Sequence, residues 1–115
     1  MTNLGSVEPF GTFLVTQSFT DVEGNDVIPD SITWSLTDGY GNVVNSREDV
    51  VVATPAQEIT VLLSNFDFNP EEETTRIITF EAEYTSVTYG AGLKTSSQYE
   101  ISISSWVEPE PLPST

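Results

Sequence analysis

Apolar and polar side chains alternate with a two-residue period along most of the chain. This period is typical of β-strands, because successive side chains of a strand point to opposite faces. The clearest case is 32–37, where Ile32, Trp34 and Leu36 alternate with three hydroxyl-bearing residues. Similar runs occur at 13–19, 59–63, 78–85 and 99–103. Helical periodicity is nearly absent, so the pattern predicts an all-β fold.

Turn-forming residues separate these runs, as at 21–26 and 38–42. About seven strands at this spacing are typical of an antiparallel, immunoglobulin-like β-sandwich. Three segments are less regular. Residues 43–52 form either two short strands or one bent strand, 65–73 form a crossover that can carry a short helical turn, and 88–97 form a flexible hairpin tip. Gln17 interrupts the apolar face of the first run.

The pattern predicts one domain, at 13–106, with an extension at each end. Residues 1–12 are expected to form an N-terminal arm, and the proline-rich segment 107–115 an extended tail. Apolar residues of the arm are candidate anchors to a neighbouring subunit: Leu4, Val7 and Phe10. Frayed termini are the alternative.

The chain of 115 residues has 18 acidic and three basic residues, for a net charge of −15. Nucleic-acid binding requires cations that replace the counterions of phosphates, so nucleic acid is not expected as a partner. An anionic membrane would also repel this surface, and no apolar run is long enough to span a bilayer. The acidity favours solubility, docking to a basic partner, or adaptation to salt, and composition does not separate these.

Histidine and cysteine are both absent. Their absence removes the commonest general base, the commonest zinc ligands and every thiol nucleophile, so we expect neither an enzyme nor a cofactor. Disulfides are impossible, and stability must come from packing. Glu81 and Glu83 share one strand face, which we interpret as solvent-exposed.

Calcium is the one metal that the oxygen-rich loops suggest, because Ca²⁺ prefers oxygen ligands. Two loops space such donors at alternate positions: Asp21, Glu23, Asn25 and Asp26 in one, and Asn65, Asp67, Asn69 and Glu71 in the other. Neither has the full twelve-residue calcium-loop pattern. Turn formation explains the same residues equally well, so calcium binding and turn formation stand as alternatives for both loops.

Three aromatic residues have no clear place in the alternation: Tyr40, Tyr89 and Trp106. They are candidate contacts to a partner. In the surface-recognition alternative, the chain is a surface module that binds a glycan or host receptor through the loops of Tyr40 and Tyr89. The other aromatics, Trp34 among them, mostly fall on the core side of the predicted strands.

The stretch 19–45 contains an acidic Gly-Asn turn, a proline, the strand Thr-Trp-Ser-Leu-Thr-Asp at 33–38, and a second Gly-Asn turn. With 59–64 and 79–84, this arrangement resembles the small Ig-like domain proteins of tailed bacteriophages, and the likeness extends over about 13–103. The resemblance implies a virion location and other virion proteins as partners, in multiple copies. It implies a decoration or cement protein on the capsid, or else a neck or tail protein. It carries over no catalytic or ligand residue.

Overall fold

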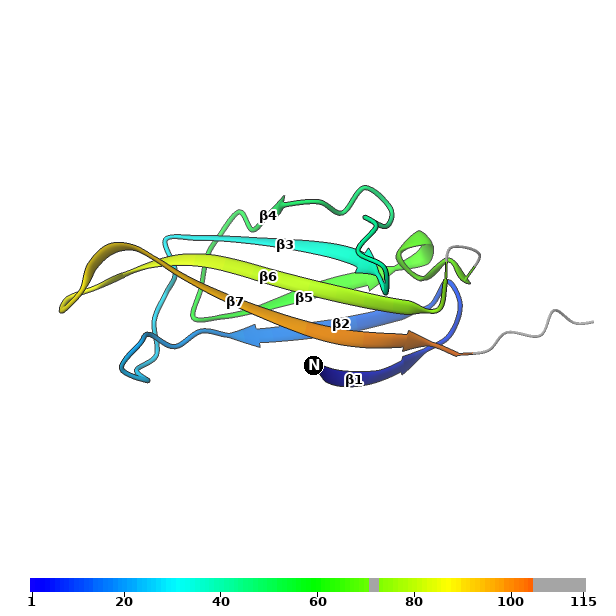
Figure 1. Cartoon of the computed structure of the whole chain (residues 1–115), viewed down its shortest axis with the longest axis horizontal. Helices are drawn as coiled ribbons and strands as arrows, with labels where there is room; N and C mark the ends of the chain where they lie inside the picture. The colour runs from blue at the N-terminus through cyan, green and yellow to red at the C-terminus, as the bar shows by residue number, and fades with distance from the viewer. Residues whose placement is uncertain (71–72, 105–115) are drawn as a thin grey trace, which may run out of the picture.

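The computed structural model describes residues 1–70 and 73–104, and its two sheets confirm the all-β prediction. The larger sheet has the strand order β1-β7-β6-β3-β4, and the smaller sheet pairs β2 with β5 (Figure 1). Their bounds are β1 Thr2–Val7, β2 Thr12–Ser18, β3 Ser31–Asp38, β4 Val50–Val51, β5 Glu58–Ser64, β6 Thr75–Ser86 and β7 Gly90–Ile103. One 3₁₀ turn, η1 at Asn65–Phe68, begins the predicted crossover after β5.

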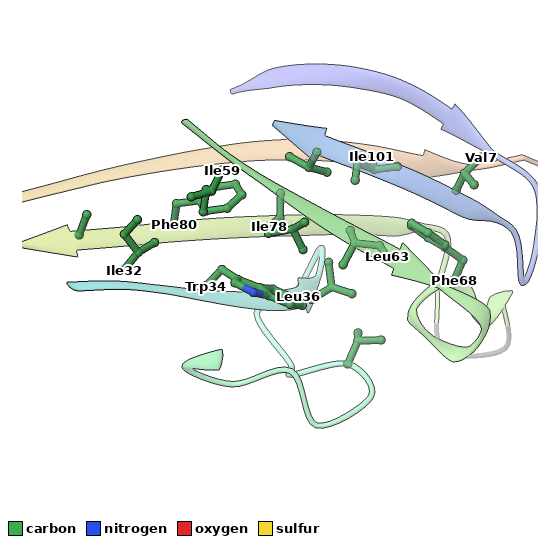
Figure 2. Packing of buried hydrophobic residues seen from close by; sticks show 14 of the residues in the cluster. Val7, Ile32, Trp34, Leu36, Ile59, Leu63, Phe68, Ile78, Phe80 and Ile101 are labelled. Atoms are coloured by element: carbon green, nitrogen blue, oxygen red, sulfur yellow. The ribbon is translucent and has the colours of Figure 1, made fainter. Parts of the chain in front are cut away.

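The core lies between the two sheets, as the alternation predicts. Ile32, Trp34 and Leu36 of β3 are buried, and so are the inward residues of β5 and β6. Figure 2 shows these side chains meeting between the layers. The polar partners of the alternation, including Glu81 and Glu83, lie on the exposed face. Gln17 is buried among the core residues, and its Oε1 has no hydrogen-bond partner among the described residues.

The first residues of the chain differ from the predicted free arm. Thr2–Val7 form β1, which pairs in parallel with β7 at the edge of the larger sheet. The Asn3 amide donates to Glu100 Oε1 over 2.8 Å, and the backbone N–H of Ser104 donates to Val7 O over 2.8 Å. Pairing satisfies backbone groups that β7 would otherwise leave open. The larger sheet is therefore mixed rather than purely antiparallel, and Val7 belongs to the core.

The segment 43–52 follows the edge of β3 with only two regular strand residues, β4. A single bridge joins Val43 to Thr37. Asn45, Ser46 and Asp49 have φ of 53°, 57° and 47°, in the left-handed region that a strand cannot contain. These three residues explain why the valines around them do not form one continuous strand.

The β6–β7 hairpin is tighter than the predicted flexible tip at 88–97. β7 begins at Gly90 and its ladder pairs Leu93 with Tyr84 and Lys94 with Glu83. The glycines at 90 and 92 adopt φ of 91° and 76°, which other residues rarely reach. Pairing with β6 thus outweighs the weak strand preference of this glycine-rich sequence. The hairpin extends well beyond the ends of β2, β3 and β5 (Figure 1).

The two Gly-Asn turns of the sequence have the same hydrogen-bonding pattern. In each, an Asp accepts from the backbone N–H of the Asn four residues on: Asp21 from Asn25 over 2.9 Å, and Asp38 from Asn42 over 3.0 Å. The backbone N–H of each Asp donates to the carbonyl of the same Asn. Gly24 and Gly41 supply the positive φ that closes the turn, 84° and 89°.

Candidate functional site

The outer face of the small sheet is nearly uncharged, in contrast to the rest of this acidic chain. We call it the small-sheet face, and it consists of the outward residues of β2 and β5: Thr12, Leu14, Thr16, Ser18, Glu58, Thr60, Leu62 and Ser64. Leu14 and Leu62 are direct cross-strand partners and are 64% and 56% exposed. Glu58 is the single ionisable residue of this face.

The polar residues of the small-sheet face are paired with each other. Thr16 Oγ1 and Thr60 Oγ1 lie 3.1 Å apart, and Ser18 Oγ donates to Glu58 Oε2 over 3.1 Å. These pairs hold the hydroxyls across the two strands. The Leu14–Leu62 pair is then the part of this face that gains most from being covered, because its contact with water has no compensating interaction.

A pair of aromatic rings lies at one end of the same ladder. The Phe10 and Phe66 ring centroids are 6.0 Å apart, with the rings at 89° to each other. The backbone N–H of Phe10 donates to Phe68 O, and that of Asn65 donates to Gly11 O, so the loop before β2 is fastened to η1. Both rings are accessible, at 39% for Phe10 and 63% for Phe66. The Phe10–Phe66 pair extends the apolar character beyond Thr12 and Ser64.

The structure gives the predicted calcium candidate Asp67 a different role. Asp67 is fully buried, and its carboxylate accepts from Arg47 Nε over 3.0 Å and from Asn45 Nδ2 over 3.0 Å. The backbone N–H of Ser64 donates to Asp67 Oδ2 over 2.9 Å. Arg47 also covers the Trp34 ring, 5.7 Å from its centroid. Asp67 therefore joins η1 to the segment between β3 and β4 through its ion pair with Arg47.

Arg76 completes this polar cluster from the start of β6. Its side chain is fully buried and donates to three backbone carbonyls of the crossover, those of Asp67 over 2.8 Å, Asn69 over 2.6 Å and Glu73 over 2.8 Å, and to that of Thr75 in β6 over 2.9 Å. Asn69, another calcium candidate of this loop, thus contributes its carbonyl to a guanidinium. Glu71 of the same loop lies outside the described residues. We call Arg76, Asp67 and Arg47 with these partners the crossover clamp.

In the first candidate calcium loop, the oxygen of Asp21 is used for turn formation. Asp21 Oδ1 accepts from the backbone N–H groups of Glu23 and Asn25, both over 2.9 Å. Among residues 1–70 and 73–104, no group of three His, Cys, Asp or Glu side chains is arranged to hold a metal ion. In the same part of the chain, no helix is long and apolar enough to cross a membrane.

The corresponding carboxylate of the second turn, Asp38, has a shifted pKa. Burial by itself raises the pKa of Asp38, but hydrogen bonds stabilise its charged form. The backbone N–H groups of Asn42 and Tyr40, the Asn42 amide and the charge of Arg76 together hold this pKa below its ordinary value. The net direction indicates a carboxylate that helps to hold the turn closed.

The structure separates the aromatic candidates. Tyr40 lies in the turn after β3, at the end of the sheet where β6 begins, whereas Tyr89 lies in the turn between β6 and β7. Both are exposed, but they occupy opposite ends of β6 and form no common platform. Leu4 on β1 is 36% exposed. Trp106 and the tail 107–115 lie outside the described residues.

Sequence reasoning missed Leu14, Leu62 and Phe66. A signal for the first two was present, since each is a leucine at a position where the alternation calls for a polar residue. The pairing of Leu14 with Leu62 depends on the register of two strands far apart in the sequence.

A search of protein-family models, of curated proteins and of solved structures finds no match to this chain.

Proposed function

We propose that this chain is a non-enzymatic structural protein of a bacteriophage particle that attaches to the capsid lattice, as a decoration or cement protein, through its small-sheet face. The immunoglobulin-like identity of the sandwich is part of the same proposal and rests on the sequence resemblance at 13–103. The absence of histidine and cysteine supports a binding role rather than catalysis.

The observation that carries the proposal is the exposed Leu14–Leu62 pair on a face with one charge, in a chain of net charge −15. Burying a leucine or phenylalanine side chain is worth roughly 1.5–3 kcal/mol. Burial of two leucines and the Phe10–Phe66 pair therefore supplies enough free energy for a modest binding affinity, once the cost of association is subtracted. A capsid presents many equivalent sites, so a modest contact per copy is compatible with high occupancy.

Co-sedimentation with the phage particles whose genome encodes this chain tests the proposal. The wild-type chain should sediment with capsids. The double variant L14D/L62D should not, because it places two negative charges in the contact. V51D is the control, because Val51, at 73% exposure, is even more exposed than the two leucines but lies on β4 of the other sheet. Both variants should keep the wild-type circular dichroism spectrum.

Two results would redirect the proposal. Sedimentation only with tailed particles, and not with tailless capsids, indicates the neck or tail alternative. Binding of the isolated domain to a glycan array, with no sedimentation, favours the surface-recognition alternative. Equal loss in V51D and in the double leucine variant would refute the role of the small-sheet face.

A further inference from the structure

The two sheets have outer edges at β1, β4, β2 and β5, and these edges differ in how well they are protected. An unpaired strand edge can accept a further strand, and proteins usually block it with charges, bulges or very short strands. β1 has a register shift between Asn3 and Ser6, and β4 has only two residues. On β5, Glu58 supplies a charge, and Asp67 accepts from the backbone N–H of Ser64. Each of these three edges thus has some protection.

The edge of β2 has none of these protections. Its seven residues, Thr12–Ser18, pair with β5 without a register shift and include no charged residue, proline or glycine. Within residues 1–70 and 73–104, β2 pairs with no other strand. A sheet of two strands is only marginally stable without further support. The edge of β2 is therefore the place in this fold that is best suited to a third strand.

The ladder with β5 shows which backbone groups of β2 face this open edge. At the two ends of the ladder, the N–H of Asn65 donates to Gly11 O and the N–H of Phe19 donates to Gln57 O. Hydrogen-bonded and non-hydrogen-bonded pairs alternate along an antiparallel ladder, so the odd-numbered residues of β2 bond to β5. The even-numbered residues direct their N–H and carbonyl groups to the open edge: Thr12, Leu14, Thr16 and Ser18.

Most of these outward backbone groups are available to a further strand. Among the described residues, the one hydrogen bond made to them comes from the Gln17 side-chain amide, which donates to the Ser18 carbonyl. Leu14 and Thr16 therefore each offer a donor and an acceptor, two residues apart, as an added strand requires. A strand that pairs here makes main-chain hydrogen bonds without displacing any part of the fold.

The larger sheet provides a floor for an added strand. In Figure 1, β1 lies beyond β2, so the five-stranded sheet extends further to this side than the two-stranded sheet. Phe13 of β2 and Tyr99 of β7 belong to the margin of the core and are only partly buried. Tyr99 pairs with Thr2 of β1, on the same side of the sandwich. The inward side chains of an added strand can cover such rings and gain from burial of apolar surface.

We propose that the edge of β2 binds an extended segment of a partner protein, which becomes a third strand of the small sheet. A second copy of this chain fits less well, because its own β1 would enter the same space and its charge of −15 would add to that of the first copy. The C-terminal segment of this chain has proline at 109, 111 and 113, which removes donors that pairing requires. The partner segment should lack proline, alternate apolar side chains, and be neutral or basic.

Hydrogen exchange of the full chain, followed by nuclear magnetic resonance, tests the proposal. In the free chain, the amides of Leu14 and Thr16 should exchange faster than that of Val15, because only the Val15 N–H is directed to β5. The probe is the peptide acetyl-Lys-Thr-Val-Thr-Val-Thr-Lys-amide. Its saturable binding should slow exchange at Leu14 and Thr16 and remove most of their difference from Val15.

Two control peptides separate strand pairing from other causes of binding. Replacing the central Thr-Val by Pro-Pro keeps the charge but removes one donor on each side of the peptide, so binding should be lost in either register. Replacing both lysines by glutamate keeps the alternation, and this peptide should bind more weakly at low salt because the chain is acidic.

A matched pair of variants tests the edge itself. T16P removes an N–H that faces the open edge and leaves the bonds to β5 in place, so it should weaken peptide binding roughly twofold to tenfold, the loss of one hydrogen bond. T60P is the control, because Thr60 is the cross-strand partner of Thr16 and its N–H faces the opposite edge. Both substitutions remove the contact between the two threonine hydroxyls, and T60P should leave the affinity unchanged. If circular dichroism shows that T16P does not fold, the Pro-Pro peptide decides the question with the wild-type chain.

Several results overturn the proposal: slow exchange of Leu14 and Thr16 in the free chain, no saturable binding of the basic peptide, equal binding of the Pro-Pro peptide, or equal weakening by T16P and T60P. Protection of the two amides that rises with protein concentration alone would assign the edge to a second copy instead. The proposal does not depend on the small-sheet face. Because the experiment uses no particles, its failure leaves the proposed capsid attachment unaffected, and the reverse holds for failed co-sedimentation.

Discussion

The two ends of the β6–β7 hairpin are built on different principles. At the end where β6 begins, the core and the crossover clamp surround buried, fully partnered charges such as Arg76 and Asp67. At the tip, the small sheet no longer covers the hairpin, and exposed side chains such as Tyr89 surround a hollow. One pair of strands thus passes from a region fixed by packing to a region open for contact.

This difference indicates where the stability of the hairpin resides. Buried polar groups are costly unless every one has a partner, so substitutions within the clamp should destabilise strongly. Exposed side chains at the tip make few contacts, so substitutions there should leave stability nearly unchanged. Measurements of unfolding along the hairpin can break or sharpen this contrast.

The largest effect is expected at Arg76. R76M keeps an unbranched side chain, shorter than that of arginine, but leaves the carbonyls of Asp67, Asn69, Glu73 and Thr75 without their donor. The variant should lose about 3–5 kcal/mol of unfolding free energy. K94M removes the exposed pair with Glu83 near the tip and should cost less than about 1 kcal/mol. Urea denaturation of both variants measures the difference, and similar losses would contradict the contrast.

The core between the ends is probed by W34A. Trp34 is buried at 7% exposure and covered by Arg47, so its truncation should cost about 3 kcal/mol through lost packing and the cavity that remains. Thermal unfolding by circular dichroism measures this loss. An unchanged midpoint would show that the predicted inward orientation of this strand is wrong.

The alternation predicted the all-β class and the inward residues of β3, because a two-residue period fixes which side chains share a face. It could not predict the crossover clamp, since Asp67 and Arg47 meet only after the layers have formed. The parallel pairing of β1 likewise depends on a strand nearly a hundred residues later, Gly90–Ile103. At the candidate site, the register that joins Leu14 to Leu62 was beyond a local pattern.

Gln17 is the last residue but one of β2, and its substitution tests how well the core is packed at this end of the small sheet. Its Oε1 is buried without a hydrogen-bond partner among the described residues, which is unfavourable. Q17L places an apolar side chain of similar size at this position and should raise the unfolding free energy by about 1 kcal/mol. A lower urea midpoint for Q17L would show that the amide has a stabilising role.

The lowered pKa of Asp38 predicts a smaller, pH-dependent effect near the clamp. Because the pKa is lower in the folded state than in the unfolded chain, Asp38 stabilises the fold fully above the ordinary aspartate value of about 3.9. The stabilisation is lost as pH falls from there through the lowered pKa. D38N should therefore show a shallower decline of stability between neutral and acidic pH than wild type. Asp21 accepts similar backbone hydrogen bonds in the equivalent turn, and D21N controls for the loss of one turn carboxylate.

The smallest effect is expected at the hairpin tip, where V87S should change the unfolding free energy by less than about 0.5 kcal/mol. Val87 is fully exposed in the turn between β6 and β7, so its removal leaves no cavity. Urea denaturation measures this change.

Hydrogen exchange compares the two parts of the hairpin directly. Amides of β7 that pair with Tyr84 and Glu83 should exchange faster than those that pair with Ile78, because Ile78 belongs to the core. Uniform protection along β7 would show that the tip unfolds with the core, and the contrast between the two ends of this hairpin would then be wrong.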